Sequence, residues 1–238
     1  MTRVLVVAAL GLAGLAPGII GPALAADLPQ PAPPQAPATY VPVVAPVYNW
    51  GGVYFGINGG YGFGSSEWTN TANAAGSTGS FNISGWVAGA TLGANFQSDA
   101  FVFGIDGDFD GTGITGTNTS AFCPIACQTK NSWLATVRAR VGYAVDRVLF
   151  YGTAGGAGGN IRTGVSGGGF DTSTEFGWTA GAGVEAAFAD NWTARVEYLY
   201  VDLQNGTCSS VGNCGFPAGD TVKFSTSLIR LGVDYKFR

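Results

Sequence analysis

Residues 84–97 read SGWVAGATLGANFQ, and their side chains alternate in character with a period of two. One face is apolar with an aromatic ring at each end, whereas the opposite face is mostly small or polar. The apolar face consists of Trp86, Ala88, Ala90, Leu92, Ala94 and Phe96. Successive side chains of a β-strand point to opposite sides, so the pattern predicts a strand. Rings at both ends of an apolar stripe are typical of a strand that faces lipid.

The same pattern recurs along the chain, most clearly in residues 176–188, FGWTAGAGVEAAF. It predicts eight strands, at residues 50–64, 84–97, 100–109, 131–143, 148–158, 175–188, 192–202 and 222–237. Three connections, near residues 97–99, 144–147 and 189–191, are short and polar. The other four are long and rich in Gly, Ser, Thr and Asn. Short periplasmic turns and long external loops characterise outer-membrane barrels, so both chain ends are expected in the periplasm.

Hydrocarbon forces such strands to close on themselves, because an open sheet edge would leave backbone N–H and C=O groups without partners. The sequence therefore predicts an all-β fold, an eight-stranded antiparallel transmembrane β-barrel of the up-and-down type. A soluble β-sandwich is the alternative fold. It would concentrate its aromatic residues in a central core rather than at the ends of apolar stripes.

The residues before the first strand predict export. Residues 1–26 combine Arg3, an apolar stretch and a small-residue end, Ala23-Leu24-Ala25-Ala26, which is typical of a cleaved signal peptide. Residues 27–48 are rich in Pro and Ala and predict an extended periplasmic linker. The barrel domain is expected at residues 49–238.

Composition narrows the function further. Hydrophobic residues make up 46% of the chain and charged residues only 11%, which is little charge for a surface that faces water throughout. Removal of the signal peptide leaves ten basic and fifteen acidic residues, so a nucleic-acid partner is not expected. Histidine is absent, which excludes His-dependent triads and imidazole-based zinc or haem sites.

The four cysteines form two local pairs, Cys123/Cys127 and Cys208/Cys214. An even number of cysteines in an exported chain predicts disulfides, here in the second and fourth long connections. The spacing favours local pairing but leaves a cross-link between connections open, as well as a zinc site with four thiolates.

Several charged residues fall on the face opposite to the apolar stripes, and they predict a charge network in the barrel interior. They are Arg138, Arg140, Glu185, Arg195, Glu197, Arg230, Asp234 and Lys236. Eight strands enclose a space that side chains alone can fill, so a network that plugs the lumen is favoured over the lining of a narrow pore.

Outward-facing aromatic residues predict anchors at the two membrane interfaces rather than a ligand-binding box. They are Trp86, Trp178, Trp192, Tyr198, Tyr200, Tyr235 and Phe237.

The chain resembles the small outer-membrane β-barrel proteins of alphaproteobacteria, the porin-family immunogenic surface proteins related to the transmembrane domain of outer-membrane protein A. The resemblance rests on AADLP at 25–29, WGGVYFGINGGYGFG at 50–64, FGIDGDFD at 103–110, GWTAGAGVEAAF at 177–188, NWTARVEYLYVDL at 191–203 and LIRLGVDYKF at 228–237. It implies an eight-stranded barrel in the outer membrane, in contact with its lipid and lipopolysaccharide and delivered by periplasmic chaperones and the barrel-assembly machinery. The family usually ends on an aromatic residue, whereas here Arg238 follows Phe237.

Three short motifs have a competing chemical interpretation. Asp106, Asp108 and Asp110 match the start of an EF-hand loop, but Thr117 stands where the bidentate Glu belongs. Residues 181–186 match a relaxed dinucleotide-binding fingerprint, but the strand pattern continues through them. Residues 155–159 are glycine-rich but lack the Lys-Ser/Thr of a phosphate-binding loop.

The sequence thus predicts a structural, non-enzymatic outer-membrane protein without a cofactor, with exposed loops and a filled lumen. Two alternatives stay open. One is a narrow channel for small solutes, and the other is a surface receptor or adhesin whose loops bind haem or a host molecule.

Overall fold

The computed structural model describes residues 48–70, 76–121, 123–165, 169–208 and 220–237. Three parts of the chain lie outside these residues: the predicted signal peptide (1–26), the predicted linker (27–48) except for its last residue, and Arg238. Within the described part, none of the secondary structure is a helix long and apolar enough to cross a membrane.

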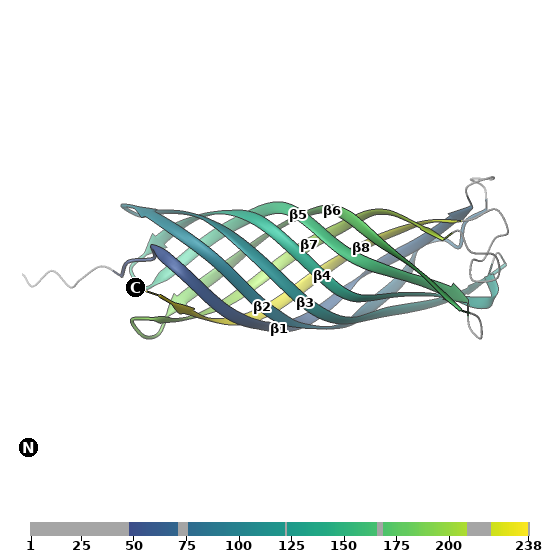
Figure 1. Ribbon diagram of the computed structural model, residues 1–238, viewed down its shortest axis with the longest axis horizontal. Coiled ribbons are helices and arrows are strands. Elements are labelled where there is room, and N and C mark those ends of the chain that lie inside the picture. Colours follow the sequence, from purple (N-terminus) through teal and green to yellow (C-terminus); the bar gives the residue numbers. More distant parts are fainter. Residues whose placement is uncertain (1–47, 71–75, 122, 166–168, 209–219, 238) are drawn as a thin grey trace, which may run out of the picture. The chain divides into compact units, whose positions relative to one another are not determined.

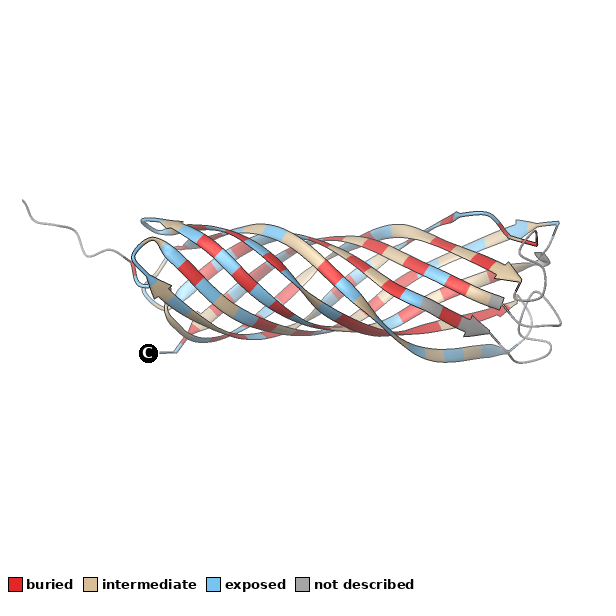
Figure 2. Cartoon of the chain, turned by 90° about the horizontal axis from the view of Figure 1, so that it is seen from above, coloured by how far each residue is buried: buried red, intermediate tan, exposed pale blue. Residues whose placement is uncertain are grey.

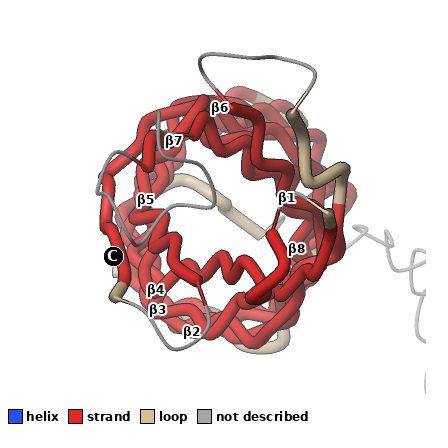
Figure 3. The backbone as a smooth tube through the Cα atoms, turned by 90° about the vertical axis from the view of Figure 1, so that its right-hand side faces the viewer, coloured by secondary structure: helices blue, strands red, loops and turns tan. Residues whose placement is uncertain are grey.

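Eight antiparallel strands form a closed ring, as predicted (Figures 1 and 3). Each strand pairs with its neighbours in the sequence, and the first pairs with the last. They are β1 (Gly52–Asn70), β2 (Phe81–Ser98), β3 (Phe101–Ser120), β4 (Cys123–Val145), β5 (Val148–Val165), β6 (Phe170–Ala187), β7 (Trp192–Cys208) and β8 (Asp220–Lys236). The closed ring leaves no strand edge unpaired, which is the condition for crossing hydrocarbon.

The two ends of the barrel differ. At one end, which we call the turn end, short connections at residues 99–100, 146–147 and 188–191 join the strands, and β1 begins beside the last residues of β8. Asp99 and Asp146 adopt positive φ angles of 53° and 54° in two of these turns, a conformation that Asp tolerates better than most residues. At the other end, the loop end, the hairpins β1–β2, β3–β4, β5–β6 and β7–β8 reach their tips.

The strands are longer at the loop end than the sequence predicts, and this is a correction. The long connection expected between residues 109 and 131 is mostly strand, because β3 runs to Ser120 and β4 begins at Cys123. β5 and β7 likewise continue beyond their predicted ends at residues 158 and 202. The apolar stripes that guided the prediction stop at the lipid boundary. Backbone pairing continues past it, because the Thr-rich sequence suits an extended backbone.

The character of the two barrel faces reverses part of the way along, and β8 shows this most clearly. Near the turn end its inward residues are Lys236, Asp234, Gly232 and Arg230, and its outward residues are Tyr235, Val233, Leu231 and Ile229. Near the loop end its inward residues are Leu228, Thr226, Phe224 and Val222, and its outward residues are Ser227, Ser225, Lys223 and Thr221. Buried and exposed residues alternate along the strands of the barrel (Figure 2), and in β8 this alternation continues while the inward and outward residues exchange polarity after Ile229.

The same reversal divides the whole barrel into two halves. In the apolar-surfaced half, towards the turn end, large side chains such as Phe96 and Ile57 face outwards and are 69% and 63% exposed. In the polar-surfaced half, towards the loop end, Thr115 and Thr117 of β3 are among the outward residues, whereas Trp68 and Ile161 point inwards and are fully buried. A half with an apolar outer surface suits lipid, and a half with a polar outer surface suits water.

Candidate functional site: the barrel interior

Asp108 is the centre of a charge layer inside the apolar-surfaced half. Its carboxylate lies 2.5 Å from an Arg138 guanidinium nitrogen, 3.4 Å from Arg230 and 3.9 Å from Arg195. The hydroxyl of Thr91 donates a hydrogen bond of 2.6 Å to Asp108, and that of Thr136 donates one of 3.0 Å. Asp108 therefore ties residues of β2, β4, β7 and β8 to β3 across the lumen.

Glu197 is the second bridging carboxylate of the layer. Arg138 donates to it at 2.8 Å, Arg230 at 2.5 Å and the hydroxyl of Tyr151 at 3.2 Å. Arg230 also donates to Asp110 at 2.8 Å. Because each guanidinium is shared between carboxylates, the layer is a connected network rather than a set of separate pairs.

A second group of charges lies closer to the turn end. Arg140 pairs with Glu185 and lies 3.7 Å from the ring centroid of Tyr151. The hydroxyl of Thr193 donates to Glu185 at 2.6 Å. Asp234 lies 3.6 Å from Arg195, which also reaches Asp108 and so links Asp234 to the first charge layer. The tyrosine ring gives Arg140 a cation–π contact in addition to its ion pair.

The structure buries all eight residues of the predicted network, but it does not give them one role. Seven of them belong to the ion-pair network described above. Lys236 instead lies at the turn end, where it donates to the backbone oxygen of Asn49 and its ammonium is 4.2 Å from the ring centroid of Tyr48. Counted over the described residues, the interior holds six buried carboxylates and five buried cations, so its net charge is small.

The predicted charge network did not include the acidic residues of β3, although the strand pattern placed Asp106 and Asp108 on its inward face. Asp106, Asp108 and Asp110 are all buried and point inwards, and Tyr54 donates a hydrogen bond to Asp106. Their spacing of two in the sequence carries the signal, since three consecutive inward positions of one strand must all face the lumen. The four interior arginines, which belong to the three strands β4, β7 and β8, need carboxylate partners, and these aspartates were the remaining candidates.

The competing motifs are resolved by the same geometry. The three aspartates of the calcium-like motif lie in a regular strand, and Thr117 points outwards from that strand. In the described part of the chain, His, Cys, Asp and Glu form no group of three that could hold a metal ion. Residues 181–186 and 155–159 lie within β6 and β5, so neither glycine-rich segment forms the strand-to-helix turn that a nucleotide requires.

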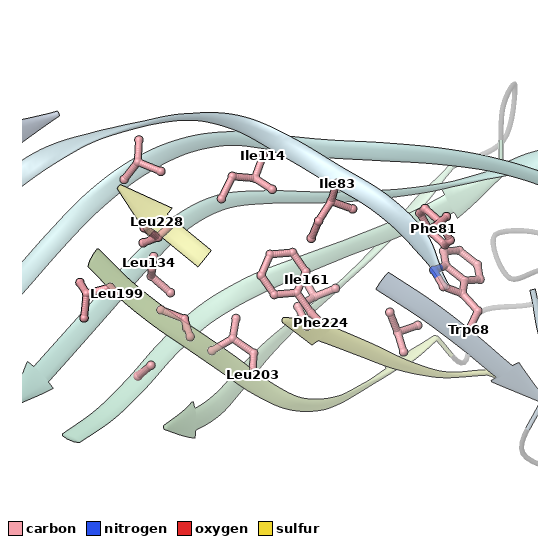
Figure 4. Close-up of a cluster of buried hydrophobic side chains, with 14 of the residues drawn as sticks. Trp68, Phe81, Ile83, Ile114, Leu134, Ile161, Leu199, Leu203, Phe224 and Leu228 are labelled. Atoms are coloured by element: carbon pink, nitrogen blue, oxygen red, sulfur yellow. The ribbon is translucent and has the colours of Figure 1, made fainter. Parts of the chain in front are cut away.

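A hydrophobic cluster fills the interior of the polar-surfaced half (Figure 4), and the sequence analysis did not predict it. Among its members are Trp68, Ile114, Leu203 and Phe224, each at most 1% exposed. The indole nitrogen of Trp68 donates to the hydroxyl of Thr129 at 2.9 Å, so even the one polar atom of this ring is satisfied. This half is built like a small soluble protein, with an apolar core and a polar surface.

A third layer closes the turn end. Tyr48 and Trp50, which precede β1, are 7% and 2% exposed and pack with Val102, Leu149 and Ala187. The rings of Tyr48 and Trp50 meet edge to face, with centroids 4.9 Å apart. Trp50 therefore belongs to the barrel filling and not to the first strand, which begins at Gly52. From the turn end to the loop end, the interior is capped by aromatics, then charged, then hydrophobic.

All seven predicted interface aromatics point outwards. Trp192, Tyr235 and Phe237 gather at the turn end, with ring centroids 5.0 Å apart for Trp192 and Tyr235 and 5.2 Å apart for Tyr235 and Phe237. Trp178 and Tyr200 meet at 5.3 Å near the boundary with the polar-surfaced half. Trp86 and Tyr198 are 57% and 46% exposed. The rings thus concentrate towards the two ends of the apolar surface, where membrane interfaces are expected.

The cysteines differ from expectation in position. Cys123 and Cys127 are residues of β4, and Cys208 is the last residue of β7, so three of the four lie in strands rather than in loops. Cys127 is fully buried and takes part in a disulfide bond. The side chains of Cys123, Cys208 and Cys214 lie outside the described residues, so the predicted pairing stays a prediction.

The sequence is similar to those of known outer-membrane proteins. Residues 31–237 match the family model described as outer membrane protein beta-barrel domain. Over 220 residues the chain is 39% identical to a 25 kDa outer-membrane immunogenic protein of Brucella canis, covering 90% of this chain and 91% of that protein. It is 34% identical to a 22 kDa outer membrane protein of Rhizobium leguminosarum bv. viciae, covering 82% and 81%.

Solved structures with a similar fold are more distant in sequence. The outer membrane protein OprG of Pseudomonas aeruginosa gives a TM-score of 0.47 at 12% identity, over 79% of this chain and 97% of that one. The attachment invasion locus protein Ail of Yersinia pestis gives 0.41 at 16% identity, over 79% and 99%. Because the family model spans most of the sequence and the relatives match at nearly full length, the chain belongs to the outer membrane protein beta-barrel family and resides in the outer membrane.

Proposed function

We propose that this outer-membrane protein is a closed, non-catalytic barrel that holds a rigid polar scaffold on the outside of the cell. The turn end lies in the periplasm and the loop end faces the exterior. The apolar-surfaced half crosses the membrane, and the polar-surfaced half rises above it.

The filling of the interior is the observation that carries this proposal. Three successive layers occupy the lumen, and each is fixed from several strands: Trp50 with Tyr48, the network around Asp108, and the cluster around Phe224. A solute would have to displace packed aromatic rings, buried ion pairs and a hydrophobic core in turn. Eight-stranded barrels are narrow enough for side chains to fill them, and here both polar and apolar layers do so.

The orientation is supported by two observations. The connections at the turn end are short, as periplasmic turns of outer-membrane barrels are. The relatives from Brucella are called outer-membrane immunogenic proteins, a name that fits a part of the molecule accessible from outside. The hydrophobic cluster supports the same assignment, because burial of apolar side chains stabilises only a segment whose surroundings are water.

A non-catalytic role is supported by residue chemistry. The chain has no histidine, which removes the commonest general base and nucleophile activator. The buried carboxylates Asp108 and Glu197 are each engaged by at least two arginines, so their oxygens are occupied by ion pairs and hydrogen bonds within the protein. We further propose that periplasmic chaperones and the barrel-assembly machinery deliver the chain, as its outer-membrane location requires.

Conductance of the purified barrel in planar lipid bilayers tests the proposal. We expect no discrete current steps, under conditions in which an open general porin added to the same chamber conducts. Reproducible steps with ion selectivity would instead establish the narrow channel as the function. Heat-dependent mobility on SDS gels, measured on the same sample, shows that the protein is folded when its conductance is recorded.

A further inference from the structure

The outer surface of the polar-surfaced half carries two cations directly opposite each other. Lys130 of β4 and Arg162 of β5 are paired in the strand register. Their sequence neighbours Thr129, Ile161 and Thr163 are buried, so both long side chains leave the barrel on its outer face. Like charges at directly opposite positions of an antiparallel pair destabilise the sheet, and such a pair calls for a compensating partner.

An aromatic ring supplies part of that compensation. Phe170 of β6 packs against Gly164 of β5. A Cβ atom added to Gly164 would lie only 2.8 Å from the Phe170 ring. The Lys130 ammonium is 4.9 Å from the centroid of this ring, and the Arg162 guanidinium carbon is 5.4 Å away. Phe170 is itself 36% exposed, so the two cations and the ring form one accessible surface.

No carboxylate completes the group. Among the described residues, neither Lys130 nor Arg162 has a salt bridge, whereas the interior arginines each have at least one. Asp171 and Glu175 of β6 alternate with Phe170 and so lie on the opposite face of that strand, and the outward carboxylates Glu67 and Asp202 belong to β1 and β7, which are not neighbours of β4 or β5 in the ring. The outer surface therefore has two positive charges, an apolar platform and, among the described residues, no carboxylate that forms a salt bridge with either cation.

The position of Lys130 and Arg162 relative to the membrane indicates which anionic group lies near them. Trp133 marks the edge of the apolar surface on β4, and Lys130 is three residues further towards the loop end. At the rise and tilt of a barrel strand this corresponds to about 7 Å. The headgroup layer of a bilayer is roughly 5–7 Å thick on each side, so the pair lies at the level of lipid headgroups.

We propose that Lys130, Arg162 and Phe170 bind an acidic sugar headgroup of lipopolysaccharide in the surrounding outer leaflet. The phosphate or carboxylate of the headgroup lies between the two cations, where the fork of Arg162 accommodates two oxygens. The sugar ring packs on the exposed face of Phe170. The assignment of this site rests on the proposed orientation, in which the loop end faces outwards. It adds a lipid-binding site to the proposed scaffold, and the closure of the lumen is tested separately.

Binding of lipid A to the refolded full barrel in a zwitterionic detergent tests this site. The probes are bisphosphorylated lipid A and the same lipid after enzymatic dephosphorylation. We expect wild-type protein to prefer the phosphorylated probe by at least tenfold. The double variant Lys130→Gln/Arg162→Gln is expected to lose this preference, and Lys130→Arg to retain it. Lys223→Gln, which removes an exposed cation from β8, is the matched control and should bind like wild type.

Two results would overturn the proposal. Equal affinity of the double variant and wild type for bisphosphorylated lipid A would show that the two cations do not form the site. Binding of a soluble polyanion, such as a heparin oligosaccharide, as tightly as the lipid and with the same dependence on Lys130 and Arg162 would assign the site to an external ligand. Heat-dependent gel mobility of every variant establishes folding, and an unchanged bilayer conductance separates failure of the site from failure of the closed-barrel proposal.

Discussion

Asp108 shows how much one residue can contribute to a barrel interior. Its carboxylate is fully buried and lies within 4 Å of three arginines, Arg138, Arg195 and Arg230. Burying those guanidinium groups is costly unless negative charge stays close to them. The exposed pair of Arg147 and Asp190 has its charged atoms 3.6 Å apart, yet both side chains are at least half exposed. Water solvates that pair whether or not it forms, and its contribution is small.

We predict that Asp108→Asn lowers the free energy of unfolding by about 3–5 kcal/mol, because three buried arginines lose a charged partner. Asp190→Asn is the control and should change it by at most about 1 kcal/mol. The measurement is urea-induced unfolding from lipid vesicles, followed by tryptophan fluorescence. If the two variants were equally stable, the interior would be solvated and the closed-lumen interpretation would be wrong.

At the scale of the element, β5 carries two consecutive glycines with opposite surroundings. A Cβ atom on Gly155 would lie 2.1 Å from the carbonyl oxygen of Val137 on β4, a distance that requires the backbone to move. A Cβ atom on Gly156 would have no neighbour within 4 Å. Gly155 is thus required by the close approach of two strands, whereas at Gly156 on the outer surface a larger side chain would meet no neighbour.

We predict that Gly155→Ala lowers the free energy of unfolding by about 1–3 kcal/mol, the usual cost of forcing atoms into a packed interior. Gly156→Ala, one residue away on the same strand, should be neutral within about 0.5 kcal/mol. Both are measured by the fraction that folds into vesicles over a urea series. A comparable loss in both variants would mean that strand propensity, and not the contact with β4, explains the effect.

At the scale of the whole molecule, the reversal of polarity fixes how far the barrel enters the membrane. Arg230 and Leu228 are successive inward residues of β8, one in the charge layer and the other in the hydrophobic cluster. The change occurs because the driving forces differ in the two surroundings. In lipid, burying apolar groups inside the barrel brings no gain, so polar networks hold the interior; in water, the hydrophobic effect operates again.

We predict that a charge on the outer surface is tolerated or rejected according to this boundary. Ala182→Arg, in the middle of the apolar-surfaced half, should lower folding stability by about 2–4 kcal/mol. Thr117→Arg, on the exposed outer face of β3 in the polar-surfaced half, should change it by at most about 0.5 kcal/mol. Folding equilibria in lipid vesicles distinguish the two. A penalty for Thr117→Arg as large as that for Ala182→Arg would place the polar-surfaced half inside the bilayer.

The strand number, the ring of antiparallel pairs, the outward aromatics and most of the buried charges can be predicted from the sequence alone. These features follow from a period of two, which any backbone in an extended conformation imposes on its side chains. Residues such as Arg138 and Glu197 could be assigned to the interior because their neighbours in the strand are apolar and face lipid.

The filling of the interior could not be predicted from the sequence and becomes visible only in the folded barrel. Asp108 and the hydrophobic residues around Phe224 come from strands far apart in the sequence, and their contacts depend on the register of all eight strands and on the bulges that shift it. In β3, β4, β5 and β7 the sequence predicts loops where the polar-surfaced half has strands, because Thr, Ser and Gly suit both loops and extended strands and no lipid-facing stripe marks them. What distinguishes the two is pairing across the barrel, which is a long-range property that no local pattern in the sequence contains.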